Sequence, residues 1–174
     1  TDEDIKAMRE ATLQVMSEVG VIWTHKPSLD ILRDAGCTWK DSRVYFPSHL
    51  VLESINKANK RPCIRGRNGQ VNELGGGDLY FHNLGGARDV FDAKRGTRRI
   101  ATQQDVIDSA RLLDALPNAH TITPFFTPRD VPGELMSLFM YRHTLPHTTK
   151  PVQGPGIQFA EEVKYALEMA QVVG

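Results

Sequence analysis

The sequence has no run of 18 apolar residues, only two cysteines, and no excess of either charge. Without a long apolar run no helix spans a bilayer, so we expect no membrane association. Lys plus Arg and Asp plus Glu number 21 each, so no overall basic field attracts nucleic acid. Cys37 and Cys63 are too few for a disulfide framework, and a reduced, cytoplasmic setting is the default expectation.

The short motifs of common enzymes are also missing. No G-x-S-x-G elbow, H-E-x-x-H helix or P-loop occurs. His143 and His147 have a spacing that suits zinc on a helix, but Pro146 lies between them and no Glu follows His143. We therefore expect no metal site. The chain starts at Thr1 without a charged-then-apolar leader, which indicates a processed or trimmed end rather than a secretory signal.

What is present is the composition of a folded domain, with 40% hydrophobic and 24% charged residues in a chain of 174. Apolar residues at helical spacing predict helices before Gly20, from Pro27 to Ala35 and from Pro47 to Ala58. Asn68-Gly69 predicts the turn of a hairpin. Residues 1–75 are thus predicted to form a helical and hairpin region that ends at the glycines 75–77.

Residues 76–174 alternate between predicted strands and helices. Strands are expected at 79–83, at 88–92 (followed by a turn at 94–96 and a helix start), at 119–126 and at 150–153. Thr102 and Asp105 form a capping box that fixes the start of the helix before the strand at 119. The strands at 119 and 150 start ~30 residues apart, which is typical of one right-handed βαβ unit.

This alternation predicts an α/β fold with an incomplete parallel sheet. A closed barrel of eight such units needs ~250 residues, so residues 76–174 are interpreted as the first βα units of a (β/α)₈ TIM-type barrel. An open three-layer sheet is the competing architecture. A truncated barrel leaves a parallel edge and apolar helix faces uncovered, and we expect the chain to self-associate as a homo-oligomer.

In such a barrel the chemistry lies at the carboxyl ends of the strands. Those ends supply candidate substrate-binding side chains, and the Gly85-Gly86 turn would let backbone amides approach a ligand or cofactor closely. The candidate side chains are His82, Asn83, Phe125, Phe126, Arg129 and Gln153, with Thr127 and Gly154 beside them.

Structural explanations compete with these assignments. Because side chains alternate along a strand, one of Phe125 and Phe126 could fill the barrel while the other packs under a helix. If both instead face a ligand, their rings suit a cationic ammonium group. His82 is the best placed histidine for a functional role, although a structural role is the favoured one.

Several strings resemble the trimethylamine methyltransferase family, whose non-pyrrolysine members include glycine betaine:corrinoid methyltransferases. The most specific is D-x-x-x-G-x-R-R-x-A-T-x-x-D, from Asp92 to Asp105. Asp130-Val131-Pro132 and Thr149-Lys150-Pro151 are two more, and the resemblance extends from the N-terminal helix to Gly174. We interpret Arg98 and Arg99 of the first string as structural partners of Asp92 and Asp105.

The resemblance implies a complete barrel in a chain nearly three times as long. It also implies transfer of an N-methyl group from a quaternary or tertiary amine, such as glycine betaine or trimethylamine, to cobalt(I). The corrinoid would be carried by a partner protein, so this chain would bind no cofactor directly. The pyrrolysine of the trimethylamine enzymes lies later in the family than residue 174.

Two other functions stay open. The chain could be a non-catalytic fragment or binding module for a betaine-like molecule, or part of a different barrel enzyme such as a lyase or a cobalamin-linked isomerase. In the methyltransferase reading, an aromatic wall and a carboxylate anchor would suffice. Phe125, Phe126, Tyr80 and Phe81 are candidates for the wall, and Arg129 or Asn83 for the anchor.

Overall fold

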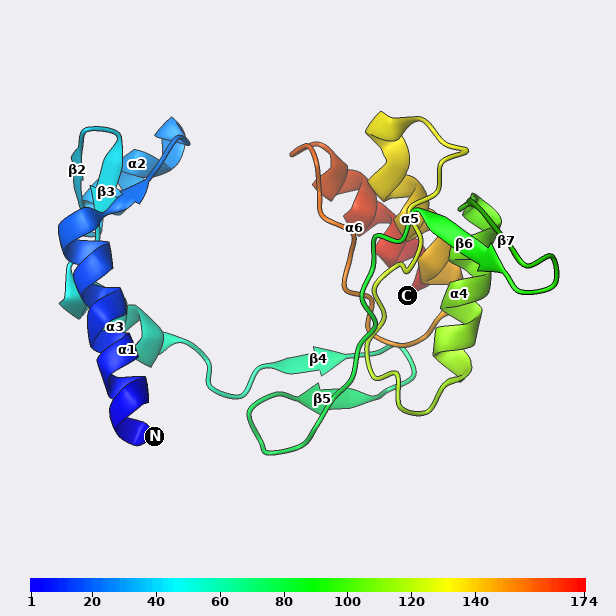
Figure 1. Cartoon of the computed structure of the whole chain (residues 1–174), viewed down its shortest axis with the longest axis horizontal. Coiled ribbons are helices and arrows are strands. Elements are labelled where there is room, and N and C mark those ends of the chain that lie inside the picture. The colour runs from blue at the N-terminus through cyan, green and yellow to red at the C-terminus, as the bar shows by residue number, and fades with distance from the viewer. The chain divides into compact units, whose positions relative to one another are not determined.

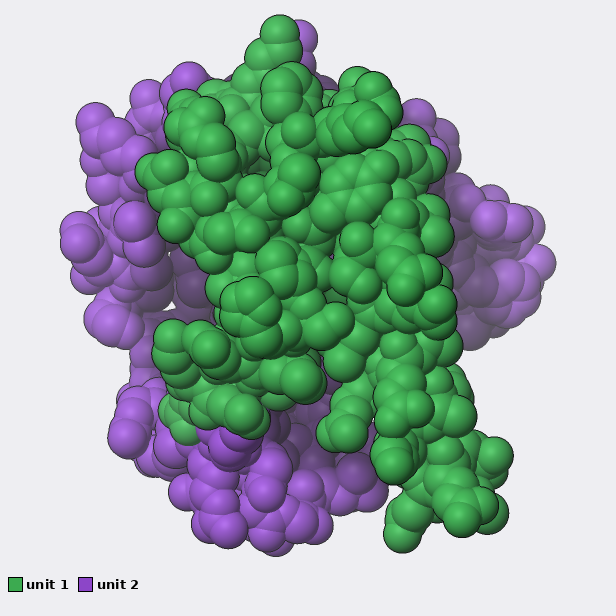
Figure 2. All heavy atoms as spheres, turned by 90° about the vertical axis from the view of Figure 1, so that its left-hand side faces the viewer, with its two compact units in different colours: residues 1–59 green, residues 60–174 purple.

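A computed structural model describes all residues from Thr1 to Gly174. The chain divides into two compact units, Thr1–Asn59 (unit 1) and Lys60–Gly174 (unit 2). Figure 1 traces the chain from blue to red, and Figure 2 colours the two units separately. The hairpin that follows residue 60 belongs to unit 2 by its contacts. No helix in the chain combines the length and the apolar character needed to cross a bilayer.

Unit 1 consists of three helices and a small antiparallel sheet. The helices are α1 (Asp2–Gln14), continued by one π-helical segment, η1 (Val15–Val19), then α2 (Lys26–Asp34) and α3 (Ser48–Lys57). The sheet has the order β1-β3-β2, with β1 (Val21–Ile22), β2 (Thr38–Lys40) and β3 (Arg43–Tyr45). Gly20 ends the first helical segment with a φ of +71°, as its position predicts, and Val44 of β3 is completely buried.

Unit 2 starts with the predicted hairpin and ends with three packed helices. Its elements are β4 (Cys63–Arg65), β5 (Val71–Glu73), β6 (Asp89–Asp92), β7 (Thr97–Ile100), α4 (Gln103–Ala115), η2 (Gly133–Leu135), α5 (Met136–Thr144), η3 (Leu145–His147) and α6 (Glu162–Val173). α5 contacts both α4 and α6. The capping box of Thr102 and Asp105 is confirmed at the start of α4.

Three extended segments of unit 2 run parallel and side by side. Single parallel bridges join His82 to Thr121, Ala87 to Phe126 and Ile122 to Val152. The middle segment therefore lies between the other two, as the regular spacing of the sequence predicts. Ile122 is completely buried. The fold is a mixture of helices and small sheets, consistent with α/β; the pairing is too short to define a barrel.

The strand β7 was not predicted: the sequence indicated only a turn at 94–96 before the helix that begins after Thr102. β7 pairs with β6 antiparallel, from Asp92↔Thr97 to Asp89↔Ile100. The side chain of Asp92 accepts the N–H groups of Lys94 and Arg95 at 3.0 and 3.2 Å, and Gly96 has a φ of +66°. These features close a tight turn, so the chain reverses before the helix begins.

The partner of Arg98 also differs from the prediction. Arg98 donates to Asp89 across the hairpin at 2.6 Å rather than pairing with Asp92. Asp89 on β6 and Arg98 on β7 are diagonal neighbours across the hairpin, whereas the Asp92 carboxylate accepts hydrogen bonds from the turn. Arg99 pairs with Asp105, as predicted.

Several large apolar side chains of unit 2 are left uncovered. Phe91 on β6 is 68% exposed and Ile100 on β7 is 60% exposed. Leu84, beside the parallel segments, is 80% exposed, and Val172 on α6 is 86% exposed. Exposed apolar side chains of this size are typical of surfaces that contact further protein.

Candidate functional site

The residues of the three family-like strings fix both ends of α4. At the amino end, the Asp130 carboxylate accepts the N–H of Gln103 at 3.0 Å. At the carboxyl end, the Lys150 ammonium donates to the carbonyls of Leu113 and Leu116 at 2.9 and 2.5 Å. Because a helix end leaves unpaired backbone groups of opposite partial charge, an acid at the start and a base at the end both stabilise it. These motif residues therefore hold α4 in place within unit 2.

A cavity of about 370 Å³ lies on the carboxyl side of the bridges His82–Thr121 and Ile122–Val152, where Gly85, Gly86, Thr123 and Pro124 line it ahead of the Ala87–Phe126 bridge. Its walls come from the Gly85-Gly86 turn, from the middle segment after Ile122, from the first turns of α5 and from the loop after Val152. The lining residues are Gly85, Gly86, Thr123, Pro124, Thr127, Met136, Ser137, Met140, Gly154, Pro155, Gly156 and Gln158. No lining side chain carries a charge, so hydroxyl, thioether, amide and backbone groups make up the site.

Glycine is required where the chain passes close to its neighbours in this cavity. A Cβ on Gly85 would lie 2.7 Å from the carbonyl oxygen of Pro124 and 2.7 Å from the Cγ2 of Thr123. A Cβ on Gly154 would overlap the hydroxyl of Tyr141. Gly86 has a φ of +93° and open space around it. At Gly85 and Gly154 the backbone itself thus forms the wall of the cavity, and no side chain covers the rim at Gly86.

Asn83 is held by the middle segment. Its amide nitrogen donates to the carbonyl of Thr123 at 2.7 Å, and its amide oxygen accepts the Thr123 N–H at 3.1 Å. Between the bridges at His82 and Ala87, the Asn83 side chain therefore makes the pair of hydrogen bonds to Thr123 that a neighbouring strand backbone would otherwise make. This gives Asn83 a structural role, and its assignment as a carboxylate anchor stays a prediction.

His82 and Gln153 lie together at a second, smaller hollow. It has a volume of about 230 Å³ and is lined by Ile64, Asn72, Leu74, Tyr80, His82, Thr121 and Gln153. The hairpin β4–β5 supplies one wall through Asn72, which is 1% exposed and donates to the carbonyl of His120 at 3.2 Å. Gly85, Gly86, Thr127 and Gly154 thus line the larger cavity, and His82 and Gln153 line this smaller hollow. His82 and Asn83 also line a separate hollow of about 430 Å³.

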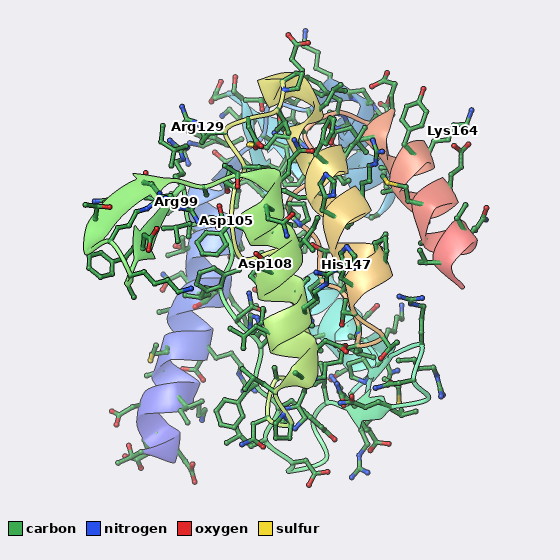
Figure 3. The ribbon with its side chains drawn as sticks, turned by 90° about the vertical axis from the view of Figure 1, so that its right-hand side faces the viewer. Arg99, Asp105, Asp108, Arg129, His147 and Lys164 are labelled. Carbon is green, nitrogen blue, oxygen red and sulfur yellow. The ribbon has the colours of Figure 1, made fainter.

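Phe125 and Phe126 contact each other, with ring centroids 4.8 Å apart and planes at 74°. Neither ring lines the cavity at Gly85. Arg129 donates its backbone N–H to Ala101 at 2.9 Å, and its exposed side chain lies near the start of α4 in Figure 3. Substrate roles for these three residues stay predictions.

The sequence analysis missed the contribution of α5 and of the loop before α6. Met136, Ser137 and Met140 line the cavity, but none of them is among the sequence-based candidates. The sequence does contain a signal for this contribution. Pro132 and Gly133 postpone the start of α5 to Met136, so that the first turn of α5 lies at the cavity. Gln158, in the loop before α6 (Glu162–Val173), also lines the cavity and is not among those candidates.

A third hollow, of about 460 Å³, lies between α5 and α6. It is lined mainly by apolar side chains, including Leu138, Leu145, Met169 and Val172. It offers few polar groups that could orient a small ligand. No group of three or more His, Cys, Asp or Glu side chains is arranged to hold a metal ion.

In α/β proteins, ligands commonly bind on the carboxyl side of the parallel strands, which is the side of the bridges His82–Thr121 and Ile122–Val152 on which this cavity lies. The profile of the trimethylamine methyltransferase (MTTB) family matches residues 1–174. The chain belongs to that family.

Its relatives share about a quarter of its residues. A glycine betaine methyltransferase of Desulfitobacterium hafniense (strain Y51) is 25% identical over 99% of this chain and 36% of its own length. The trimethylamine methyltransferase MttB of D. hafniense (strain DSM 10664 / DCB-2) is 26% identical over 99% of this chain and 35% of its own length. MttB of Methanosarcina thermophila is 25% identical over 77% of this chain. The chain thus spans about a third of the length of the first two relatives.

Proposed function

We propose that this chain forms the first part of a barrel enzyme that removes an N-methyl group from a quaternary or tertiary amine. The main support is the position of the uncharged cavity at Gly85, on the carboxyl side of the bridges His82–Thr121 and Ile122–Val152, in a chain of this family. The exposed apolar side chains on α6 and β6 would pack against the remaining units of the barrel.

The chemistry of such an amine fits the cavity. A quaternary nitrogen is already positive, so it leaves as a neutral amine when the C–N bond breaks, with the bonding electron pair staying on nitrogen. A tertiary amine gives a neutral product in the same way when it enters in its protonated, ammonium form. Neither substrate then needs a proton donor from the protein, and none of the lining side chains is an acid. The protein then has to bind the amine, hold one methyl group toward the acceptor and exclude water. Met136 and Met140 give a soft, apolar wall for the methyl groups.

In this proposal the methyl acceptor is the cobalt(I) of a corrinoid that a partner protein holds, and that cobalt supplies the nucleophile. The rim of the cavity fits the approach of such a large flat ring, because Gly85 and Gly86 are exposed and present no side chain. These two glycines would border the ring through their backbone. This chain would contribute binding and orientation of the amine.

The test uses the complete gene product. Glycine betaine and trimethylamine are each titrated into the protein by calorimetry, and methyl transfer is followed as the loss of cob(I)alamin absorbance. We expect heat and transfer with one of the two amines. If Phe125 and Phe126 form an ammonium cage, replacing either with Ala weakens binding by ~1 kcal/mol or more. Absence of binding by both amines would contradict the proposal.

A binding module without catalysis is the second candidate. It is favoured by the fact that the whole cavity is built within unit 2, from residues 85 to 158, without the rest of a barrel. Binding of the amine without any methyl transfer by the complete gene product would favour this candidate over the enzyme.

A further inference from the structure

Glu162 is a buried acid that the site described so far does not use. It lies in the first turn of α6 and is only 4% exposed. One carboxylate oxygen, Oε2, accepts the backbone N–H of Gln158 at 2.8 Å. The other, Oε1, is buried without any hydrogen-bond partner. Buried carboxylates are normally paired with a cation or fully hydrogen-bonded, so this half-satisfied group requires an explanation.

No basic side chain of the chain pairs with Glu162. On the same helix, Lys164 approaches Glu168 at 3.9 Å and is exposed, as its position on α6 in Figure 3 shows. A position in the first helical turn does favour an acid, because the helix dipole is positive there. That effect explains an acid at residue 162 and the use of Oε2, but it does not explain why Oε1 is buried and unpaired.

The carboxylate hydrogen-bonds a loop that forms one wall of the cavity at Gly85. That wall is the loop 154–158, from which Gly154, Pro155, Gly156 and Gln158 line the cavity. Glu162 binds the loop at Gln158, and the Tyr141 hydroxyl binds it at the carbonyl of Pro155, at 3.2 Å. Burial and then the negative charge of Glu162 raise the pKa of Tyr141. The charge of Glu162 is therefore felt at a hydroxyl that contacts the loop.

A cation in this cavity would otherwise find no counter-charge, because none of its lining side chains is charged. Close to a protein surface, charges interact over several ångströms more strongly than in bulk solvent. We propose that Glu162 acts through the 154–158 loop as the counter-charge that makes the cavity selective for a quaternary ammonium group over an uncharged group of the same shape. This inference depends on the proposed function, since it assigns the charge preference of the same site.

Two ligands of equal shape separate the effect of charge from that of packing. Glycine betaine carries a trimethylammonium group, and 3,3-dimethylbutanoate carries a tert-butyl group in its place. Both are titrated into the complete gene product, and the ratio of their affinities is the readout. With Glu162→Gln, which keeps an acceptor for Gln158, we expect the preference for glycine betaine to fall about tenfold.

Matched variants complete the experiment. Glu161→Gln removes a charge from the exposed neighbouring residue and should leave the ratio unchanged, whereas Glu162→Asp keeps the charge and should retain the preference. Glu162→Met removes the charge without burying a new polar group, in case Glu162→Gln does not fold. Tyr141→Phe removes the bond to Pro155 at constant charge and should weaken both ligands equally.

An equal loss for both ligands with Glu162→Gln would overturn the inference and make Glu162 only a support of the loop, while the proposed function would stand. A wild-type protein that shows no preference for glycine betaine over 3,3-dimethylbutanoate would overturn the inference alone, whereas absence of binding by both glycine betaine and trimethylamine would overturn the proposed function as well.

Discussion

Arg99 and Asp105 are joined by two parallel hydrogen bonds of 2.7 Å each, from Nη1 to Oδ2 and from Nη2 to Oδ1. Arg99 comes from the end of β7 and Asp105 from the first turn of α4, and Figure 3 labels both. Asp105 also accepts the N–H and the hydroxyl of Thr102, each at 2.8 Å. One carboxylate thereby fixes the hairpin, the start of the helix and the turn between them.

The first prediction concerns the pH dependence that this carboxylate produces. The Arg99 guanidinium lowers the pKa of Asp105 from 3.8 to about 2. Since the folded pKa lies below the unfolded one, the stabilisation is present above about pH 4 and is lost as the pH falls toward 2. It amounts to roughly 2 kcal/mol. Asp105→Asn should remove this dependence.

Urea unfolding of the wild type and of Asp105→Asn at pH 7, 4 and 2.5 measures the effect. The difference between the two proteins is read at each pH, because other carboxylates, such as Asp4 and Asp114, also titrate with lowered pKa values. A difference that stays constant over this range would show that the pair with Arg99 does not stabilise the fold.

The second prediction concerns Lys150, which binds the last carbonyls of α4. Lys150→Met leaves those carbonyls without their charged donor, and we expect a loss of roughly 1–2 kcal/mol in the free energy of unfolding. Lys164→Met is the matched control, because Lys164 is exposed and only approaches Glu168 at 3.9 Å. It should change stability by less than about 0.5 kcal/mol. Equal effects of the two substitutions would contradict the capping role.

The third prediction separates the structural role of Asn83 from a role in substrate binding. Asn83→Ala removes both hydrogen bonds to Thr123 and should cost about 1–3 kcal/mol of stability. Asn118→Ala, at an exposed loop position, should cost little. Thermal unfolding measures the loss, and calorimetry with glycine betaine measures binding. Unchanged stability with weaker binding would instead support Asn83 as a ligand of the substrate.

The parts of this structure that local chemistry determines could be predicted from the sequence. The capping box of Thr102 and Asp105, the hairpin turn at Asn68-Gly69 and the stop at Gly20 each depend on a few neighbouring residues. The parallel order of the three segments was also predictable, because a regular βαβ spacing permits few topologies.

The parts that depend on distant residues were not predictable. Nothing near Asn83 in the sequence indicates that its amide pairs with Thr123, forty residues later. The strand β7 was missed because its exposed residues show no apolar alternation, and Asp92 acts through a turn rather than through Arg98. The burial of Glu162 depends on how the 154–158 loop folds against α6, and the periodicity of apolar residues gives no information about that.

The last prediction tests the close approach of backbone at the cavity. Gly85→Ala would place a methyl group 2.7 Å from both the Pro124 carbonyl and the Thr123 Cγ2, so the 85–86 turn must move away from the middle segment. Gly133→Ala is the control, because nothing lies within 4 Å of its added Cβ. We expect Gly85→Ala to lower stability by roughly 1–3 kcal/mol, the usual cost of overpacking, and to weaken amine binding. The 85–86 turn both contacts the middle segment and forms the rim of the cavity, so stability and amine binding should fall together. If Gly85→Ala abolishes binding but keeps full stability, the added methyl group blocks the ligand itself.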